Sequence, residues 1–179
     1  SSPFCIDSFY LLKKFNLDFI KIPSGEITNL PLLRHIKKFN NDIILSTGMS
    51  NVNEINTAIK ILKNKNRKII LLHCNTEYPT PFEDINLNAM LSLKKQFKLD
   101  VGYSDHSLGI QVPIIAASLG AQVIEKHFTI SKKMMGPDHA ASLNPKELIS
   151  MVKAIRSTET ILGIRKKFVS KSEKKNILI

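Results

Sequence analysis

Apolar and polar positions along this chain form alternating blocks that predict strands and helices in succession. Short runs rich in apolar and β-branched residues predict five strands, at 19–24, 42–47, 68–74, 100–104 and 122–128. Longer stretches predict helices near 6–16, 29–39, 51–64, 86–97, 109–119 and 145–162. In the stretch 51–64, Val52, Ile55 and Ile59 recur at steps of three and four, which is typical of a helix that buries one face.

The last of these helices has the clearest ends. Asn144 stands directly before Pro145, and this order fits an N-cap followed by the first helical position. Gly163 stands where the helix would end, and glycine is the usual residue at a helix C-terminus. We therefore expect a well-defined helix over 145–162.

Polar side chains gather where the predicted strands end. At steps of 22, 28, 30 and 23 residues, one strand–helix unit each, the ends carry Ser24, Ser46, Cys74, Ser104 and His127. Strands that are apolar on both faces, each followed by a helix, indicate a parallel sheet. In α/β proteins of this kind the functional site lies at the carboxyl ends of the strands, so these residues mark a candidate site.

The absence of a GxGxxG segment favours a barrel over an open dinucleotide-binding sheet. A complete (β/α)8 barrel needs about 250 residues, whereas this chain has 179 residues and five predicted strands. The sequence therefore predicts an α/β fold, a partial (β/α)8 TIM-type barrel over residues 1–163. It would comprise about strands 4 to 8 of the barrel with their helices.

Composition narrows the class of protein. Hydrophobic residues make up 43% of the chain, which is ordinary for a globular domain. No apolar run approaches the roughly 18 residues of a membrane-spanning helix, and the stretch from Phe4 to Ile20 carries four charged residues, unlike a signal peptide. The two cysteines, Cys5 and Cys74, form no CxxC pair, so we expect free thiols, a cytoplasmic location and no membrane partner.

The net charge of +11 raises the question of a nucleic-acid partner. Only four of the 26 basic residues are arginine, the residue best suited to bidentate contacts with phosphates and bases. The lysines are scattered along the predicted helices, as on solvated helix faces. We therefore expect no nucleic-acid partner, and attraction of an anionic small molecule is the functional alternative to a merely solvated surface.

Two short motifs carry the most informative residues. GYSDHS at 102–107 and IEKHFT at 124–129 each place a histidine, His106 or His127, at or just beyond the end of a predicted strand. Because strand side chains alternate between faces, Ser104 shares a face with His106, and Glu125 shares one with His127. A single histidine there is usually structural, but two at neighbouring strand ends also suit Mn²⁺, Mg²⁺ or Fe²⁺. The pattern alone leaves both interpretations open.

Four further polar segments follow the predicted strands: KIPSGE at 21–26, STGM at 46–49, HCNTEYPTP at 73–81 and GPDHAAS at 136–142. Lysine and hydroxyl groups suit phosphate and carboxylate ligands, and a carboxylate accepts hydrogen bonds from sugar hydroxyls. Each segment alone is equally compatible with an ordinary strand exit or a capped turn. Their candidate ligand-binding side chains are Lys21, Ser24, Glu26, Ser46, Thr76, Tyr78 and Asp138.

Taken together, these segments resemble the sialic acid synthase family, which includes N-acetylneuraminate and legionaminic acid synthases. The matching strings are KIPSGEITNLPLL, ILSTGM, LHCNTEYPTPFEDINLNAM, GYSDHS, IEKHFT and GPDHAASLNP, in this order along almost the whole chain. The resemblance implies condensation of phosphoenolpyruvate with N-acetylmannosamine or a related 2-acetamido sugar, giving a sialic-acid-type nonulosonic acid and phosphate. It also implies a (β/α)8 barrel, a following antifreeze-like domain with 164–179 as the linker to it, and a homodimer of the full-length protein.

The resemblance assigns roles to individual residues. It makes His106 and His127 the ligands of a divalent metal ion, usually Mn²⁺, with Mg²⁺ or Co²⁺ as substitutes, and it counts them as catalytic together with Lys21 and Glu26. Its phosphoenolpyruvate-binding positions are Lys21, Ser24, Ser46, Thr76 and Ser104. Its sugar-binding positions are Glu26, Tyr78 and Asp138.

The family pattern also includes groups that this chain does not contain. These are a glutamate and a lysine upstream, and an arginine of the downstream domain that reaches the partner's site. We therefore expect the chain alone to lack condensation activity and to associate through the two edges of its sheet. The alternatives are a barrel fragment that only binds a ligand or is inactive, and another phosphoenolpyruvate-dependent aldol-type synthase.

Overall fold

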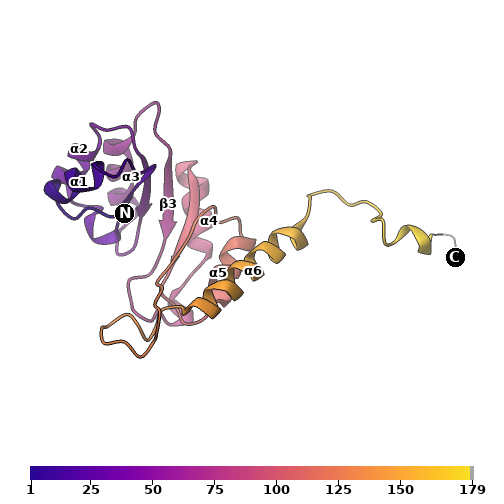
Figure 1. Ribbon diagram of the computed structural model, residues 1–179. Coiled ribbons are helices and arrows are strands. Elements are labelled where there is room, and N and C mark those ends of the chain that lie inside the picture. Colours follow the sequence, from indigo (N-terminus) through magenta and orange to yellow (C-terminus); the bar gives the residue numbers. More distant parts are fainter. Residues whose placement is uncertain (178–179) are drawn as a thin grey trace.

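A curled, fully parallel sheet forms the centre of the computed structural model, which describes residues 1–177 (Figure 1). Its strands are β1 (Phe19–Ile22), β2 (Asp42–Ser46), β3 (Ile69–His73), β4 (Asp100–Asp105) and β5 (Ile124–Lys126). They pair in the order of the sequence, each parallel to the next. The predicted architecture, a partial (β/α)8 barrel, is confirmed.

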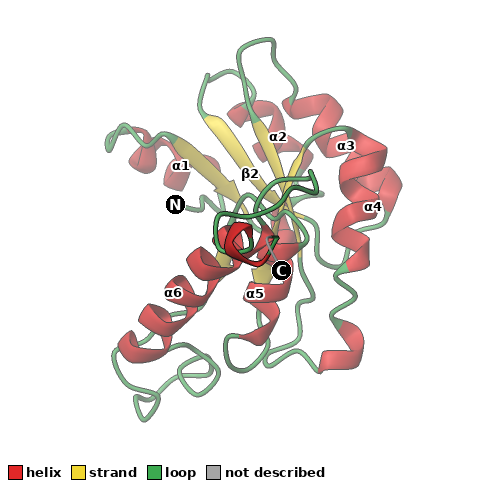
Figure 2. Cartoon of the chain, turned by 90° about the vertical axis from the view of Figure 1, so that its right-hand side faces the viewer, coloured by secondary structure: helices red, strands yellow, loops and turns green. Residues whose placement is uncertain are grey.

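Helices connect the strands and pack against them (Figure 2). They are α1 (Ile6–Lys13), α2 (Leu30–Ile36), α3 (Val52–Leu62), α4 (Asn88–Phe97), α5 (Gln111–Ser118) and α6 (Pro145–Leu162), with short 3₁₀ turns η1 (Ser24–Glu26), η2 (Phe82–Asp84) and η3 (Lys174–Asn176). Helix α4 packs against β3 and β4, and α6 lies along α5. The helices predicted from the sequence are all present, most of them a few residues shorter than the pattern.

The strand predicted at 122–128 differs most from its pattern. Only Ile124–Lys126 pair continuously with β4. Beyond them, Phe128 forms an isolated bridge with Leu143, and the backbone N–H of Leu143 donates to the carbonyl of His127 at 2.9 Å. The returning chain therefore takes over the pairing, and His127 stands just beyond the end of β5.

Helix α6 begins and ends where the sequence predicts. The Asn144 side chain accepts from the backbone N–H of Glu147 at 3.0 Å, and the Glu147 carboxylate accepts from the backbone N–H of Asn144 at 2.9 Å. This reciprocal pair satisfies two N–H groups that the helix cannot. Gly163, with φ of 55°, ends the helix in the left-handed region that glycine adopts without strain.

Alternation along the strands separates the apolar core from the concave face. On β1, Ile20 and Ile22 are fully buried against the helix layer, while Lys21 between them points to the other face. Leu45 on β2 and Leu71 on β3 are likewise fully buried in the same core. The helices thus cover one face of the sheet, and the opposite face is left for polar side chains.

Arg67 joins the ends of two helices. Its guanidinium donates to the carbonyl of Leu62, the last residue of α3, at 2.7 Å, and to that of Ile36, the last residue of α2, at 3.1 Å. Further bonds reach the carbonyls of Asn41, at 3.0 Å, and Phe39. The last carbonyls of a helix have no hydrogen-bond donor within the helix. The Arg67 side chain supplies that donor at the ends of both α2 and α3.

Arg67→Met should lower the free energy of unfolding by about 2–3 kcal/mol, because carbonyl acceptors in a buried place lose their charged donor. Urea unfolding followed by circular dichroism measures the loss. Arg156→Met is the matched control: Arg156 pairs with Glu159 on the exposed face of α6, and its loss should cost less than about 0.5 kcal/mol. Equal losses in the two variants would show that Arg67 acts as an ordinary surface charge.

After Gly163 the chain leaves α6 as an exposed segment that runs away from the sheet and ends in η3 (Figure 1). The predicted linker 164–179 covers this segment and two further residues, 178 and 179, which lie outside the described part; its role stays a prediction. Among residues 1–177, no helix combines the length and the apolar character needed to cross a membrane.

Candidate functional site

A pocket of about 420 Å³ opens at the carboxyl ends of the strands, where the sequence predicts a site. Every strand or the loop that follows it contributes to the wall. The lining residues are Lys21, Pro23, Ser24, Gly25, Ser46, Met49, Thr76, Tyr78, Ser104, His106, Glu125 and His127. The structure therefore brings together eight of the ten predicted site residues, which lie up to 106 positions apart in the sequence.

The two histidines converge in this pocket. Their ring centroids are 5.4 Å apart and the rings are nearly perpendicular, at 89°. The Nδ1 of His106 donates to the carbonyl of Asn75 at 2.5 Å, and the Nδ1 of His127 lies 3.6 Å from the carboxylate of Asp138. In metal-binding proteins an acceptor at one ring nitrogen orients the ring and frees the other nitrogen to bind the ion.

Burial lowers the pKa of His106, and the neighbouring His127 lowers it further, against the opposing effect of the Asn75 carbonyl. The ring is therefore neutral at pH 7, as a metal ligand must be. Within residues 1–177, however, no three His, Cys, Asp or Glu side chains are grouped as a complete metal site. The pair fits two ligands of an ion whose remaining positions are left to other groups.

Glu125 lies at the centre of the pocket although the predicted site omits it. Its Oε1 accepts from the ammonium of Lys21 at 3.0 Å and from the hydroxyl of Ser104 at 2.7 Å. Burial alone would raise the pKa of Glu125, but the charge of Lys21 and the bond from Ser104 outweigh burial and lower it. The available signal was strand alternation, which puts Glu125 on the face of His127.

The β1 and β2 ends form the other side of the pocket. Ser24 Oγ accepts from the backbone N–H of Gly48 at 3.1 Å and lies 3.2 Å from the thiol sulfur of Cys74. A Cβ atom on Gly48 would come within 2.7 Å of Thr76 and 2.9 Å of Ser24, so glycine allows the backbone to lie this close to the two side chains. In the described chain the buried hydroxyl of Ser46 has no partner, which leaves it available to a ligand.

Tyr78 covers the two imidazoles from the loop after β3. Its ring centroid lies 4.1 Å from that of His106 and 5.4 Å from that of His127. The side chain is about half exposed, and burial of the rest raises its pKa. Tyr78 is therefore a neutral aromatic wall between the histidines and solvent.

Two predicted residues lie outside the pocket lining. The Glu26 carboxylate, in η1, accepts from the side chain of Asn29 at 2.6 Å. Asp138 lies in the loop between β5 and α6, and its carboxylate is 3.6 Å from the Nδ1 of His127. The predicted contact of these two residues with a sugar stays a prediction, and for Asp138 the structure adds an orienting contact with a predicted metal ligand.

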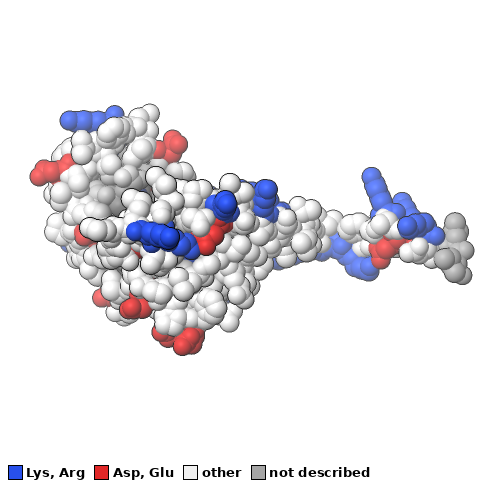
Figure 3. All heavy atoms as spheres, turned by 60° about the horizontal axis from the view of Figure 1, so that its bottom comes forward, with Lys and Arg blue, Asp and Glu red and all other residues white. Residues whose placement is uncertain are grey.

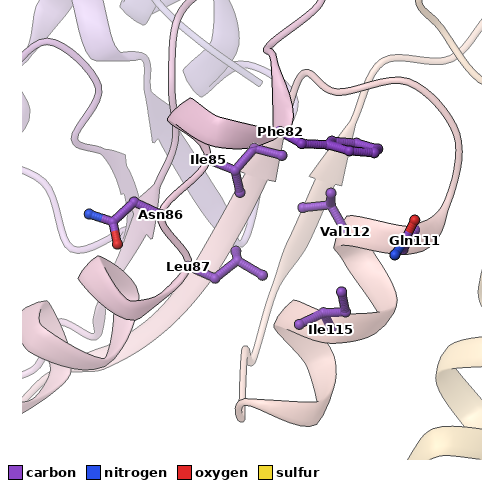
Figure 4. Close-up of a pocket in the computed structure, with 7 residues that line it drawn as sticks. All are labelled: Phe82, Ile85, Asn86, Leu87, Gln111, Val112 and Ile115. Carbon is purple, nitrogen blue, oxygen red and sulfur yellow. The ribbon is translucent and has the colours of Figure 1, made fainter.

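A second pocket, of about 300 Å³, lies between η2 and α5 (Figure 4). It is lined by Phe82, Ile85, Asn86, Leu87, Gln111, Val112 and Ile115. None of these side chains is titratable, and none belongs to the first pocket. This pocket therefore offers no acid, base or nucleophile.

Basic side chains do not form one continuous patch on the face shown in Figure 3. On the face shown in Figure 3, lysines and arginines stand in separate groups, with acidic side chains among them. This agrees with the scatter of lysines in the sequence. The expectation of no nucleic-acid partner stays a prediction.

Comparison with known proteins decides the family. Residues 1–167 match the model of the NeuB family. This chain belongs to the NeuB family. The resemblance inferred from the motifs is thereby confirmed.

Two curated relatives of this NeuB chain are N,N'-diacetyllegionaminic acid synthases. That of Campylobacter jejuni is 56% identical over 100% of this chain and 54% of its own length. That of Legionella pneumophila is 44% identical over 97% of this chain and 50% of its own length. The chain thus spans about half the length of the curated relatives it matches.

A solved structure extends the likeness to three dimensions. The N-acetylneuraminic acid synthetase of Leptospira borgpetersenii, in complex with citrate, superimposes with a TM-score of 0.90 and 38% identity. The match covers 99% of this chain and 62% of that one. The NeuB chain therefore has the fold of the corresponding part of that synthetase.

The Lys21–Glu125 pair predicts a pH dependence of stability. Because the folded-state pKa of Glu125 is lowered, its stabilising contribution is complete above the unfolded pKa of about 4.3 and is lost as pH falls through the folded value. In EDTA, Glu125→Gln should unfold at lower urea than wild type at pH 7, and the difference should shrink below about pH 4.

Glu159→Gln, on the exposed face of α6, is the control for this comparison. It should differ from wild type by less than about 0.5 kcal/mol at pH 7. A Glu125→Gln variant that matches wild type throughout the pH series would mean that Lys21 gains nothing from Glu125 in the folded protein.

Proposed function

We propose that the full-length protein containing this chain condenses phosphoenolpyruvate with a 2-acetamido sugar to give a nonulosonic acid and phosphate. One observation carries the proposal: in a member of the NeuB family, an ammonium group, several hydroxyls and two imidazoles converge on one pocket. A cationic and hydroxyl-rich wall suits an anionic substrate. A pair of imidazoles suits a divalent ion.

Phosphoenolpyruvate would bind on the side of Lys21 and the serines. Lys21 contributes a point charge at the end of β1, where its side chain is 13% exposed and a bound anion would be little screened by water. Ser24, Ser46 and Thr76 offer hydroxyl donors around the same volume. Ser46 is the most telling of these, because its buried hydroxyl is otherwise left without a partner among residues 1–177.

The aldehyde end of the open-chain sugar would bind beside His106 and His127. These residues are the proposed ligands of Mn²⁺, with Mg²⁺ or Co²⁺ as substitutes. The Asn75 carbonyl orients the His106 ring, and the Asp138 carboxylate lies 3.6 Å from His127. A divalent ion bound there supplies Lewis-acid polarisation of the aldehyde oxygen. Tyr78 would close this side and limit the access of water.

The bonds then change as follows. Carbon 3 of phosphoenolpyruvate joins the aldehyde carbon, the aldehyde oxygen takes up a proton and becomes a hydroxyl, water adds to carbon 2, and phosphate leaves. The residues of this chain hold the phosphate, the carboxylate and the aldehyde in one orientation. Orientation and charge stabilisation of this kind supply most of the rate in such sites.

The first acceptor to test is 2,4-diacetamido-2,4,6-trideoxymannose, because relatives at 56% and 44% identity are named N,N'-diacetyllegionaminic acid synthases. N-acetylmannosamine is the alternative acceptor. Release of phosphate by the full-length protein with each sugar, phosphoenolpyruvate and Mn²⁺ decides between them. Release with neither sugar would refute the proposed function.

The proposal also takes the full-length protein to be a cytoplasmic homodimer. The free thiols of Cys5 and Cys74 suit that compartment.

His106→Ala and His127→Ala should each lower Mn²⁺-dependent turnover of the full-length protein by at least about 100-fold while leaving it folded, because each removes a proposed ligand. Steady-state kinetics across a Mn²⁺ titration, with circular dichroism as the test of folding, measures this. His35→Ala, in α2 and outside the pocket, is the control. If the histidine variants keep full activity in EDTA, the metal has no role at these residues.

Lys21→Met should raise the KM for phosphoenolpyruvate by about 10-fold or more and change the KM for the sugar little, because a charged hydrogen bond to the phosphate or carboxylate is lost. The double variant Lys21→Met with Glu125→Gln separates this effect from the unpaired carboxylate that the single variant leaves behind. An effect confined to the sugar would show that the two ends of the pocket are assigned the wrong way round.

A further inference from the structure

The residues directly behind the two histidines form a second, fully buried polar group. We propose that the ion pair between Asp105 and Lys126 is a positioning pair, which fixes the ends of β4 and β5 so that His106 and His127 present their rings to one shared point. The inference rests on the proposed metal site and extends it from the ligands to the residues that hold them.

The sheet register puts these residues in place. Ser104 lies opposite Glu125 and Asp105 lies opposite Lys126, and each histidine follows directly in the chain. On the concave face Ser104 donates to Glu125 at 2.7 Å. On the other face Lys126 donates to Asp105. The two strands are therefore tied on both faces immediately before the histidines.

Ser107 brings the chain on the far side of His106 into the same group. Its backbone N–H and its hydroxyl donate to Asp105 Oδ1 at 3.0 and 2.7 Å, and its carbonyl accepts from the ammonium of Lys126. Asp105 and Ser107 are fully buried, and the Lys126 side chain is 4% exposed. Both neighbours of His106 are thus bonded to the residue that precedes His127.

The placement of this pair argues for a role beyond stability. The free-energy cost of removing two charges from water offsets most of their mutual attraction. An apolar pair of the same size would therefore stabilise a fold at least as well. What a buried ion pair adds is a defined geometry, because both partners need their hydrogen bonds satisfied in one arrangement. A second Lys–Asp pair joins Lys68 to Asp100, the first residue of β4. It lies at the opposite end of β4, and both side chains are about half exposed.

The test uses the full-length protein and the double variant Asp105→Asn with Lys126→Met, which removes both charges and keeps the side-chain sizes. Because no unpaired buried charge is left, the variant should fold with a melting temperature close to that of wild type. Its dissociation constant for Mn²⁺, measured by electron paramagnetic resonance of the free ion, should rise about 10-fold or more. Lys126→Arg keeps the charge and should retain most of the affinity.

Asp100→Asn with Lys68→Met is the matched control, since it removes the same two residue types from the other end of β4. Its Mn²⁺ affinity should equal that of wild type. If the Asp105–Lys126 double variant does not fold, Asp105→Asn with Lys126→Gln gives the same comparison, because it also removes both charges and keeps a donor beside an acceptor.

A metal-free readout separates this inference from the metal itself. In long-range ¹⁵N–¹H spectra of the imidazoles, the double variant should shift the signals of His106 and His127 and leave those of His35 and His73 in place. Unchanged signals together with wild-type Mn²⁺ affinity would overturn the inference. If wild type binds no Mn²⁺, the proposed metal is wrong, and the imidazole signals alone decide whether the pair positions the rings.

Discussion

The close approach of β4 and β5 is the constraint on which the site depends. At Gly102 a Cβ atom would lie 2.3 Å from the carbonyl oxygen of Val123, so β5 can come this near only because the residue is glycine. The same carbonyl accepts from the backbone N–H of Tyr103 at 2.9 Å. That contact sets the register that puts Ser104 opposite Glu125. The pairing on both faces, and the meeting of the two histidine-bearing ends, follow from this alignment.

Much of this could be predicted from the sequence, because it depends on patterns local to the chain. Apolar blocks separated by helical stretches give the strand order, and polar residues at the block ends give the pocket. The alternation of side chains along a strand places His106 and Ser104 on one face of the sheet and Asp105 on the other. It also indicates that Asp105 and Lys126 face away from the pocket, although it does not show that they meet.

Contacts that need register or curvature could not be predicted. The Lys21–Glu125 pair joins residues 104 positions apart, and nothing in either segment indicates the partner. The bonds of Arg67 to two helix ends depend on where α2 and α3 stop, and sequence patterns locate helix ends only to within a few residues. The strand β5 is shorter than predicted because Leu143, which follows a long loop, pairs with the backbone at His127 and Phe128. That pairing is not visible in the local sequence.

The Lys21–Glu125 contact also reports the shape of the sheet. Lys21 lies on β1 and Glu125 on β5, the two outer strands of the described sheet, and four strand spacings in a flat sheet would separate them by about 19 Å. Their charged groups meet at 3.0 Å, which is possible only if the sheet curls and both side chains point to its concave face. The same curvature directs Ser24, Ser46 and Ser104 toward one volume. Barrel curvature is therefore what turns five separate strand ends into a single site, and the ion pair across it offsets the charge of Lys21.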